Sequence, residues 1–322
     1  MATRISLIRS VRQREERQQI GTFVTSYVRG LIEIERGCLL RLSTAARASG
    51  QIQIALNSVI RAQCLETIPS AEVSEEFANV LWLQKEEKLA VQFLKDLVHR
   101  APLSDDNKQD LSRKALWLSR LGTWTAEACI EKPTEIWDRY FDPSILLLER
   151  VQELDARVDL NQATIYRECA MFAERQFHAT LRSPDAIRWK VYVDRKRQEI
   201  EQRSMEIQSN SDKTREKALR DHQNRAQKLL QADSELFKKH NTLRETFLKQ
   251  AMDMHSRCLQ ISDSFDNDSA IRFCSLWFAN FDDESILECV KMALAKVPSR
   301  KLVFLAVSLS ANFYLPSLLT TR

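Results

Sequence analysis

The chain has 322 residues, 48 of them Lys or Arg and 44 Asp or Glu, so its formal net charge is only +4. Hydrophobic residues make up 44% and charged residues 29%, a composition typical of a globular chain and not of a disordered one. Only 5 glycines and 7 prolines occur, far below the average usage of about 7% and about 5%. This scarcity excludes a fold of many tight hairpins and most glycine-cradled nucleotide sites. A mostly helical protein with few, long elements remains.

The cysteine pattern and the apolar runs exclude further classes. Seven cysteines are scattered without any CxxC spacing, at positions 38, 64, 129, 169, 258, 274 and 289. We expect them to be free, buried thiols in a reducing compartment. The longest apolar run, 302–309, contains Ser308 and is far shorter than the roughly 20 residues that span a bilayer. We therefore expect no membrane association.

The N-terminal stretch allows two interpretations. Residues 1–14 are rich in Arg, contain Ser and precede the first acid, Glu15, which resembles a mitochondrial presequence. Ile5, Ile8 and Val11 also fit one face of an amphipathic helix, and we favour this second interpretation. The next predicted helix has an apolar face made of Phe23, Val24, Tyr27, Val28, Leu31 and Ile32.

A loose repeat follows, with segments that start near Arg41, Asn79 and Lys114. Aligning Ala46, Leu81 and Trp117 gives steps of 35 and 36 residues (81 − 46 and 117 − 81). Three alanines then share one offset, at Ala55, Ala90 and Ala126, where a small side chain would let a second helix approach the first. The predicted turns lie near Gly50, Lys85 and Gly122. A period near 34 with paired helices is typical of tetratricopeptide-like hairpins, which must stack to bury their apolar faces.

Two more helices are predicted after the repeat. The first carries Trp137, Tyr140, Phe141, Ile145 and Leu148, with an interruption near Asp142 and Pro143. The second shows an i, i+4 series made of Ile165, Cys169, Phe172, Ala173 and Phe177. From Asp194 to Gln227 nearly half of the residues are charged, with mixed signs, which predicts exposed helix. A break at 209–212, with Ser211 as N-cap, would make this region a long helical hairpin standing partly away from the solenoid.

The C-terminal part is predicted to pack densely again. One helix carries a bulky stripe of Ile271, Cys274, Leu276, Trp277 and Phe278, and the next starts at Ser285 with Ile286, Val290 and Met292. A break at 297–299 precedes a last helix over 302–314 that is apolar on nearly every side. We expect that helix to need a neighbour and the isolated chain to self-associate.

Signatures of catalysis are missing from the sequence. GxxxxGK[ST], GxGxxG, HRD, DFG, HExxH and GxSxG do not occur. His255, Cys258, Cys274 and Cys289 could bind zinc only if all four converged, and their spacing matches no common site. We favour buried thiols and an ordinary histidine. The sequence thus predicts no catalytic, cofactor-binding or metal-binding residue, and interleaved acids disfavour a nucleic-acid-binding helix.

The segment from Asp266 resembles the C-terminal part of the FAT region of ATM-type kinases, the ataxia-telangiectasia-mutated kinase and its fungal telomere-maintenance orthologue. Their R-x-C-S-L-W helix matches Arg272, Cys274, Ser275, Leu276 and Trp277, and their later turn and K-x-L-x-L helix match 297–299 and 301–305. An upstream A-x-F-A-x-x-Q-(Y/F) pattern matches Ala170, Phe172, Ala173, Gln176 and Phe177. The charged middle fits the family's long hairpin in character only, and the repeats fit its tetratricopeptide-like pairs.

The resemblance implies an all-α fold: an α-solenoid of tetratricopeptide/HEAT-like hairpins with a long charged hairpin. Helical repeats would cover residues 1–182, the charged hairpin 183–256 and the C-terminal FAT helices 257–322. The relatives continue into a kinase domain, before which this chain is expected to stop. The full-length family would be a non-specific serine/threonine-protein kinase, whereas this chain would be no enzyme.

In function, the resemblance implies a scaffold in the nucleus, in double-strand-break signalling and telomere maintenance. The expected partners are the kinase domain of the same polypeptide in full-length relatives, a second copy of the chain and other proteins. Direct contact with nucleic acid is not expected. The alternative is a freestanding tetratricopeptide-like adaptor that binds a protein partner in its concave face.

Overall fold

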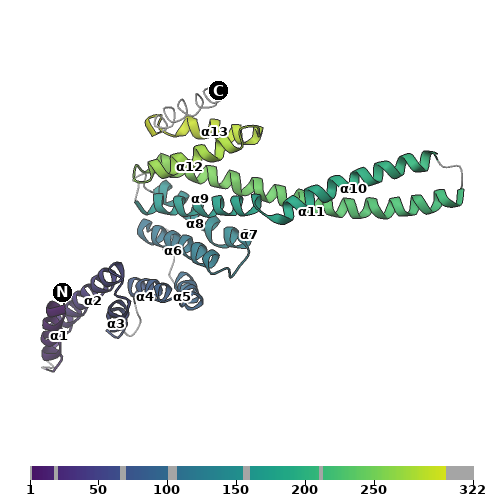
Figure 1. The fold of residues 1–322 in the computed structure, drawn as a ribbon. Coiled ribbons are helices and arrows are strands. Elements are labelled where there is room, and N and C mark those ends of the chain that lie inside the picture. The colour runs from purple at the N-terminus through teal and green to yellow at the C-terminus, as the bar shows by residue number, and fades with distance from the viewer. Residues whose placement is uncertain are drawn as a thin grey trace, which may run out of the picture. The chain divides into compact units, whose positions relative to one another are not determined.

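The computed structural model describes residues 2–17, 21–65, 70–100, 107–154, 160–209 and 213–301. Every regular element in these ranges is a helix, as predicted (Figure 1). The chain divides into two compact units, Met1–Ala156 and Arg157–Arg322. The helices of the first unit are α1 (Ala2–Arg17), α2 (Gly21–Ala48), α3 (Ile52–Gln63), α4 (Ala71–Leu83), α5 (Glu87–Arg100), α6 (Lys108–Glu127), α7 (Pro133–Ile136), the π-helix η1 (Trp137–Phe141) and α8 (Asp142–Leu154).

The first unit is a row of stacked helical pairs. α2 packs against α3, α4 against α5, and α6 against η1 and α8, while α3 meets α4 and α5 meets α6. The core of the first pairs is formed by small and branched side chains of α1 to α4, namely Ile5, Leu39, Ala46, Ala55, Val59, Ala62, Val73 and Val80. The predicted repeat positions Leu81, Ala90 and Trp117 are also buried. Each pair therefore covers the apolar face that its neighbour exposes, as expected for a solenoid.

The first helix of each pair ends in the same way. Gly50, Lys85 and Cys129 have positive φ values of 74°, 67° and 52°. At each end the residue with positive φ and the residue after it donate backbone hydrogen bonds back to the last turn, as Gly50 N to Arg47 O and Gln51 N to Ala46 O do. These are Schellman caps, which satisfy the free carbonyls of a helix end. The turns predicted at Gly50 and Lys85 are thus confirmed.

The turn predicted near Gly122 is wrong. Gly122 lies inside α6, which continues to Glu127, and the true turn is at Cys129. Ala126 accordingly lies on the first helix of the third pair and not on its second helix. Gly122 is a glycine for another reason: a Cβ atom there would lie 2.8 Å from Cζ of Phe141. The glycine serves close packing between α6 and η1, so its presence does not mark a helix end.

The close packing of Gly122 against Phe141 leads to a prediction. Gly122→Ala should destabilise the chain by about 1 to 3 kcal/mol, because the added methyl group forces the fully buried Phe141 ring to move. Gly37→Ala is the matched control, since Gly37 lies in α2 and a methyl group there would find open space within 4 Å. There the exchange should stabilise by about 0.5 to 1 kcal/mol through helix propensity. Denaturant midpoints of both variants test this; equal midpoints would contradict the packing argument.

The interruption predicted near Asp142 and Pro143 takes the form of a wider turn and not of a break. The chain stays helical from Pro133 to Leu154, and Trp137–Phe141 is a π-helix in which Asp142 N donates to Trp137 O. Because Pro143 has no N–H to offer the preceding turn, a widened turn next to it keeps the helix continuous. The apolar residues predicted here, Trp137, Tyr140, Phe141, Ile145 and Leu148, are all buried.

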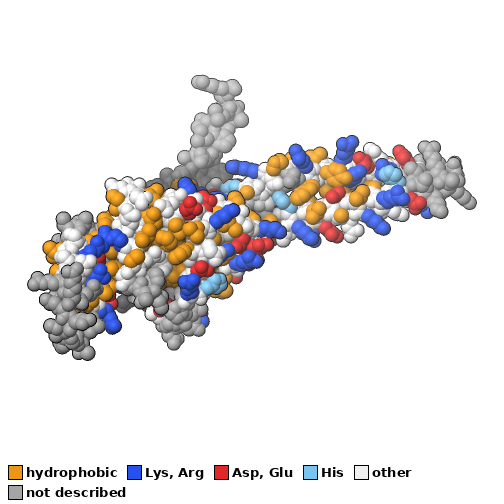
Figure 2. Space-filling model, turned by 90° about the horizontal axis from the view of Figure 1, so that it is seen from below, with side chains coloured by type: hydrophobic (Ala, Val, Ile, Leu, Met, Phe, Trp, Pro, Cys, Tyr) orange, Lys and Arg blue, Asp and Glu red, His pale blue; other side chains and the backbone are white. Residues whose placement is uncertain are grey.

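The second unit is built around one very long helix. Its described helices are α9 (Leu160–Leu181), α10 (Pro184–Ser209), α11 (Lys213–Ile261), α12 (Asp266–Ala279) and α13 (Glu284–Lys296). α11 has 49 residues and packs against α9, α10, α12 and α13. α10 and the first half of α11 form the predicted charged hairpin, which extends away from the other helices of this unit (Figure 1). Figure 2 shows both Lys or Arg and Asp or Glu side chains along the hairpin, so both signs of charge occur on the same face.

Other apolar positions were predicted with mixed success. The series Ile165, Cys169, Phe172, Ala173 and Phe177 is buried on α9 as predicted. Tyr27, Ile271 and Met292 are 56%, 61% and 56% exposed, contrary to prediction. Helical spacing assigns a side chain to a face of its helix, but it does not decide whether a neighbouring helix covers that position. The side chains of Phe23 and Val24, the N-cap Ser211 and the segment 302–322 lie outside what the structure describes.

Candidate functional site

The carboxylate of Glu174, on α9, has hydrogen-bond partners on two other helices of the second unit. Arg272 of α12 donates from Nη1 to both of its oxygens at 3.1 Å. Nε2 of His255, a fully buried side chain of α11, lies 3.4 Å from Oε2. His178, one turn along α9, places its Nε2 3.7 Å from Oε1. One buried acid therefore joins the three helices α9, α11 and α12.

The network continues from Arg272 along α12. Its Nε donates to Oδ1 of Asp268 at 2.8 Å. Oδ2 of Asp268 accepts from Nε and Nη2 of Arg167, on α9, at 3.0 and 2.8 Å. The Arg167 guanidinium also lies over the ring of Phe265, 5.1 Å from its centroid. The order Arg167, Asp268, Arg272, Glu174 alternates in sign, so each charge has an opposite neighbour. We call these four residues with His255 the ionic network.

Electrostatics hold the acids of the ionic network in their charged forms. Burial alone would raise the pKa of Glu174, but the hydrogen bond with His255 and the charge of Arg272 outweigh it and lower the pKa. Burial likewise opposes ionisation of Asp268, and hydrogen bonds from Arg272 and Arg167 lower its pKa. The hydrogen bond to Asp268 raises the pKa of Arg272. All these shifts favour charged pairs, which is the state that links the helices.

His255 and the cysteines do not form the zinc site that the sequence left as an alternative. His255 faces Glu174, whereas Sγ of Cys258 contacts the backbone oxygen of Ala163 at 3.6 Å and accepts from Ser269 at 3.5 Å. Among the described residues, no group of three or more His, Cys, Asp or Glu side chains could hold a metal ion. Burial raises the pKa of Cys258, and that of Cys274 to about 11. These thiols therefore stay protonated and unreactive at neutral pH.

The expectation of buried thiols holds only in part. None of the seven cysteines forms a disulfide bond, but Cys64 and Cys129 are exposed. Cys129 is exposed because it occupies the Schellman turn after α6, where the backbone leaves the packed face.

Lys301 closes the end of α11. Its ammonium group donates to the backbone oxygens of Leu259 and Ser262 at 2.7 and 2.9 Å, and it pairs with Asp263 and Asp266 at 2.8 and 2.9 Å. The side chain is only 3% exposed. A positive charge at a helix C-terminus satisfies free carbonyls and favours the helix dipole. Lys301 thus fastens the chain after α13 to the last turn of α11.

The first unit uses acids of α4 to join neighbouring pairs. Glu76 accepts from Ser43 and Arg47 of α2. Glu75 accepts from Trp117 at 2.9 Å and from Arg120 at 2.8 Å, both on α6. One acidic helix is therefore bonded to the helices on both of its sides.

A second joint of the first unit lies at Glu131. Its Oε1 accepts from Lys95 of α5 and from the hydroxyl of Tyr140 in η1, both at 2.8 Å. Burial opposes ionisation of Glu131, but the bonds from Lys95 and Tyr140 lower its pKa. The pair of α4 and α5 is thereby tied to the pair that follows.

These arrangements are joints between helices: Glu174, Glu75, Glu76 and Glu131 each accept hydrogen bonds from side chains of other helices. Sequence reasoning named Arg272 and Lys301 only as motif residues and did not single out Glu174, Asp268 or Arg167. One signal was available, because Asp268 and Arg272 are four residues apart on one helix, the spacing of an ion pair.

The described helices include none that is long and apolar enough to cross a membrane. No protein-family model matches the chain. The chain is 29% identical over 318 residues to the serine/threonine-protein kinase TEL1 of Cryptococcus neoformans, which covers 98% of this chain and 10% of that kinase. It is 26% identical to tel1 of Neurospora crassa over 85% of its length and 24% identical to the serine-protein kinase ATM of Sus scrofa over 85%. The chain thus spans about a tenth of the length of these relatives.

Solved structures show the same fold. The structure described as "FAT and kinase domain of CtTel1" matches 88% of this chain with a TM-score of 0.58 and 23% identity, using 18% of its own chain. The "Tel1 kinase butterfly symmetric dimer" matches 92% with a TM-score of 0.65 and 21% identity, using 12% of its own chain.

Proposed function

The chain is homologous to a helical segment of the TEL1 and ATM kinases, and we propose that it is a non-catalytic scaffold segment of an ATM-like serine/threonine-protein kinase. The observation that carries this proposal is an alignment that covers 98% of the chain. Residues that the FAT-like pattern shares, Arg272 and Lys301, also lie at the joints between helices. A scaffold needs such joints because its helices must keep their positions relative to one another.

The proposal extends to organisation and cellular role. We assign helical repeats to 1–182, a charged hairpin to 183–256 and C-terminal FAT helices to 257–322. By analogy with its relatives, the segment would act in the nucleus, in DNA double-strand-break signalling and telomere maintenance. It would bind no cofactor and transfer no phosphate itself. Its partners would be the kinase domain of the same polypeptide and a second copy, since relatives are described as Tel1 dimers.

The alternative, a freestanding adaptor that binds a peptide, receives less support from the first unit. Arg113 and Arg120 of α6 could attract an acidic peptide, but they already pair with Glu72 and Glu75 of α4. A peptide would have to displace these intramolecular acids. The α4–α6 surface therefore fits a joint better than a docking groove.

A segment exchange tests the proposal. The homologous tenth of the Cryptococcus neoformans TEL1 kinase is replaced by this chain, and the phosphotransfer activity of the purified chimera is compared with that of a deletion of the same segment. We expect the chimera to retain activity and the deletion to lose it. A chimera as inactive as the deletion, although folded, would contradict the scaffold role. A chimera that also carries Gly37→Ala is the control for effects of mutagenesis and purification, because we expect this substitution to be neutral or stabilising.

A further inference from the structure

Helix α11 runs through both the charged hairpin and the rest of the second unit. We define the arm as α10 with residues 213–246 of α11, and the base as α9, α12, α13 and residues 247–261 of α11. Among the described side chains of residues 220–246, in the arm part of α11, only Ala226 is buried. From Phe247 onward most side chains are buried, among them Leu248, Ala251 and Met252. Burial of the side chains of α11 therefore drops near residue 246.

The partner helix of α11 also changes at this level. Trp189 of α10 packs on His240, with ring centroids 5.7 Å apart. Phe172 of α9 packs on Phe247, with centroids 6.2 Å apart. α9 ends at Leu181 and α10 begins at Pro184, so α11 passes from one partner to the other between His240 and Phe247. Only a two-residue turn connects the two partner helices there.

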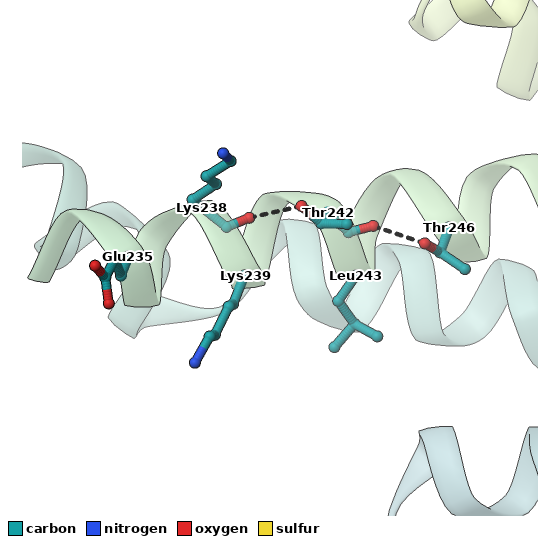
Figure 3. A pocket seen from close by; sticks show the side chains of 6 residues that line it. All are labelled: Glu235, Lys238, Lys239, Thr242, Leu243 and Thr246. Carbon is teal, nitrogen blue, oxygen red and sulfur yellow. Dashed lines mark hydrogen bonds between the residues drawn. The ribbon is translucent and has the colours of Figure 1, made fainter. Parts of the chain in front are cut away.

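Two threonines lie in this same stretch and weaken it. The hydroxyl of Thr242 donates to Lys238 O at 3.0 Å, and that of Thr246 donates to Thr242 O at 2.8 Å, each one turn back along α11 (Figure 3). Such bonds compete with the backbone ladder of the helix, and they slightly destabilise and often bend it. Thr180 makes the same kind of bond to Gln176 O near the end of α9.

The surface around these threonines is open. Glu235, Lys238, Lys239, Thr242, Leu243 and Thr246, all of α11, line a shallow hollow, and the side chains of Lys238 and Lys239 point away from the helix on opposite sides (Figure 3). The threonine side chains are exposed. This face of α11 therefore carries no cover that would resist a bend.

We propose that residues 238–246 of α11 form a hinge about which the arm moves relative to the base. Three observations coincide there: the loss of burial, the change of partner helix and the tandem threonine bonds. The ionic network and Lys301 hold α11 on the base side, so motion is confined to the arm side. The hinge is a property of this chain, and its test does not depend on the proposed role in a kinase.

Distances between spin labels test the hinge. Labels are placed at Asn224, on the arm, and at Glu288, on α13 of the base; both side chains are exposed. Asn224 is 18 residues from Thr242 (242 − 224), about 27 Å along the helix, so a swing of about 20° would move it by about 9 Å. Labels enter through a non-canonical amino acid, because the exposed Cys64 and Cys129 would react with thiol reagents.

The comparison uses a matched pair of double variants in the full chain. Thr242→Val with Thr246→Val keeps side-chain shape and branching but removes both hydroxyls, whereas Thr242→Ser with Thr246→Ser keeps the hydroxyls. We expect the valine variant to have a narrower distance distribution in double electron–electron resonance. The distribution of the serine variant should be as broad as that of the original chain. Equal widths in all three proteins, or a serine variant as narrow as the valine one, would overturn the hinge.

Discussion

Ala90→Arg should unfold the first unit at a much lower denaturant concentration than the original chain. Ala90 is fully buried in α5, where this helix packs on α4. Arginine adds volume for which the pair has no room and a charge that has no partner in the core. We expect a loss of at least about 3 kcal/mol in the free energy of unfolding. Circular dichroism during denaturant titration measures this.

The matched control is the neighbouring residue. Leu89→Arg introduces the same side chain in the same helix, at a position that is 51% exposed. It should change stability by about 0.5 kcal/mol, since surface substitutions away from special features have small effects. If the two variants shifted the midpoint equally, the register of the second repeat would be wrong.

The success at Ala90 and the failure at Ala126 have one physical explanation. Small residues at equal offsets identify close helix contacts, which is why Ala55 and Ala90 are buried where the alignment placed them. The helix end of the third repeat is harder to predict, because Cys129 adopts the positive φ usually given to glycine. The one glycine available in the third repeat, Gly122, serves packing against Phe141.

Charged contacts between distant segments could not be predicted from the sequence for another reason. Arg272 and Glu174 are 98 residues apart, and local spacing carries no information about such a pair. The apolar periodicity of α9 and α12 predicts that both helices have a buried face but not that an acid and an arginine meet there. The same holds for Lys301, whose partners, from the last turn of α11 to the first residue of α12, lie 35 to 42 residues earlier in the chain (301 − 266 and 301 − 259).

Removing the arginine of the ionic network should destabilise the second unit. Arg272→Met leaves Glu174, whose side chain is 11% exposed, without its main counter-charge. Breaking a fully buried pair in this way costs about 3 to 5 kcal/mol. Because the Arg272 side chain is 33% exposed, we expect a smaller loss of about 2 to 3 kcal/mol. Hydrogen exchange of peptides from α9 and α12 in the full chain reports the second unit separately.

The double variant distinguishes a charge effect from a loss of packing. Glu174→Leu with Arg272→Met removes both charges and keeps apolar volume, and Asp268 still pairs with Arg167. An apolar replacement of a buried pair is often nearly neutral, so the double variant should be more stable than Arg272→Met alone. Strictly additive losses would mean that the two side chains contribute independently and that no ionic network exists.

The pH dependence gives the same test without removing a side chain. The pKa of Glu174 in the folded chain lies below the ordinary value of 4.5, because His255 and Arg272 outweigh the effect of burial. The stability from its charged form is therefore present above about pH 4.5 and is lost as the pH falls through the lowered pKa of the folded state. Glu174→Gln cannot titrate, so its unfolding free energy should fall less steeply than that of the original chain below this pH. Parallel curves for the two proteins down to acid unfolding would show that Glu174 has the same proton affinity in both states, and the ionic network would then contribute nothing to holding α9, α11 and α12 together.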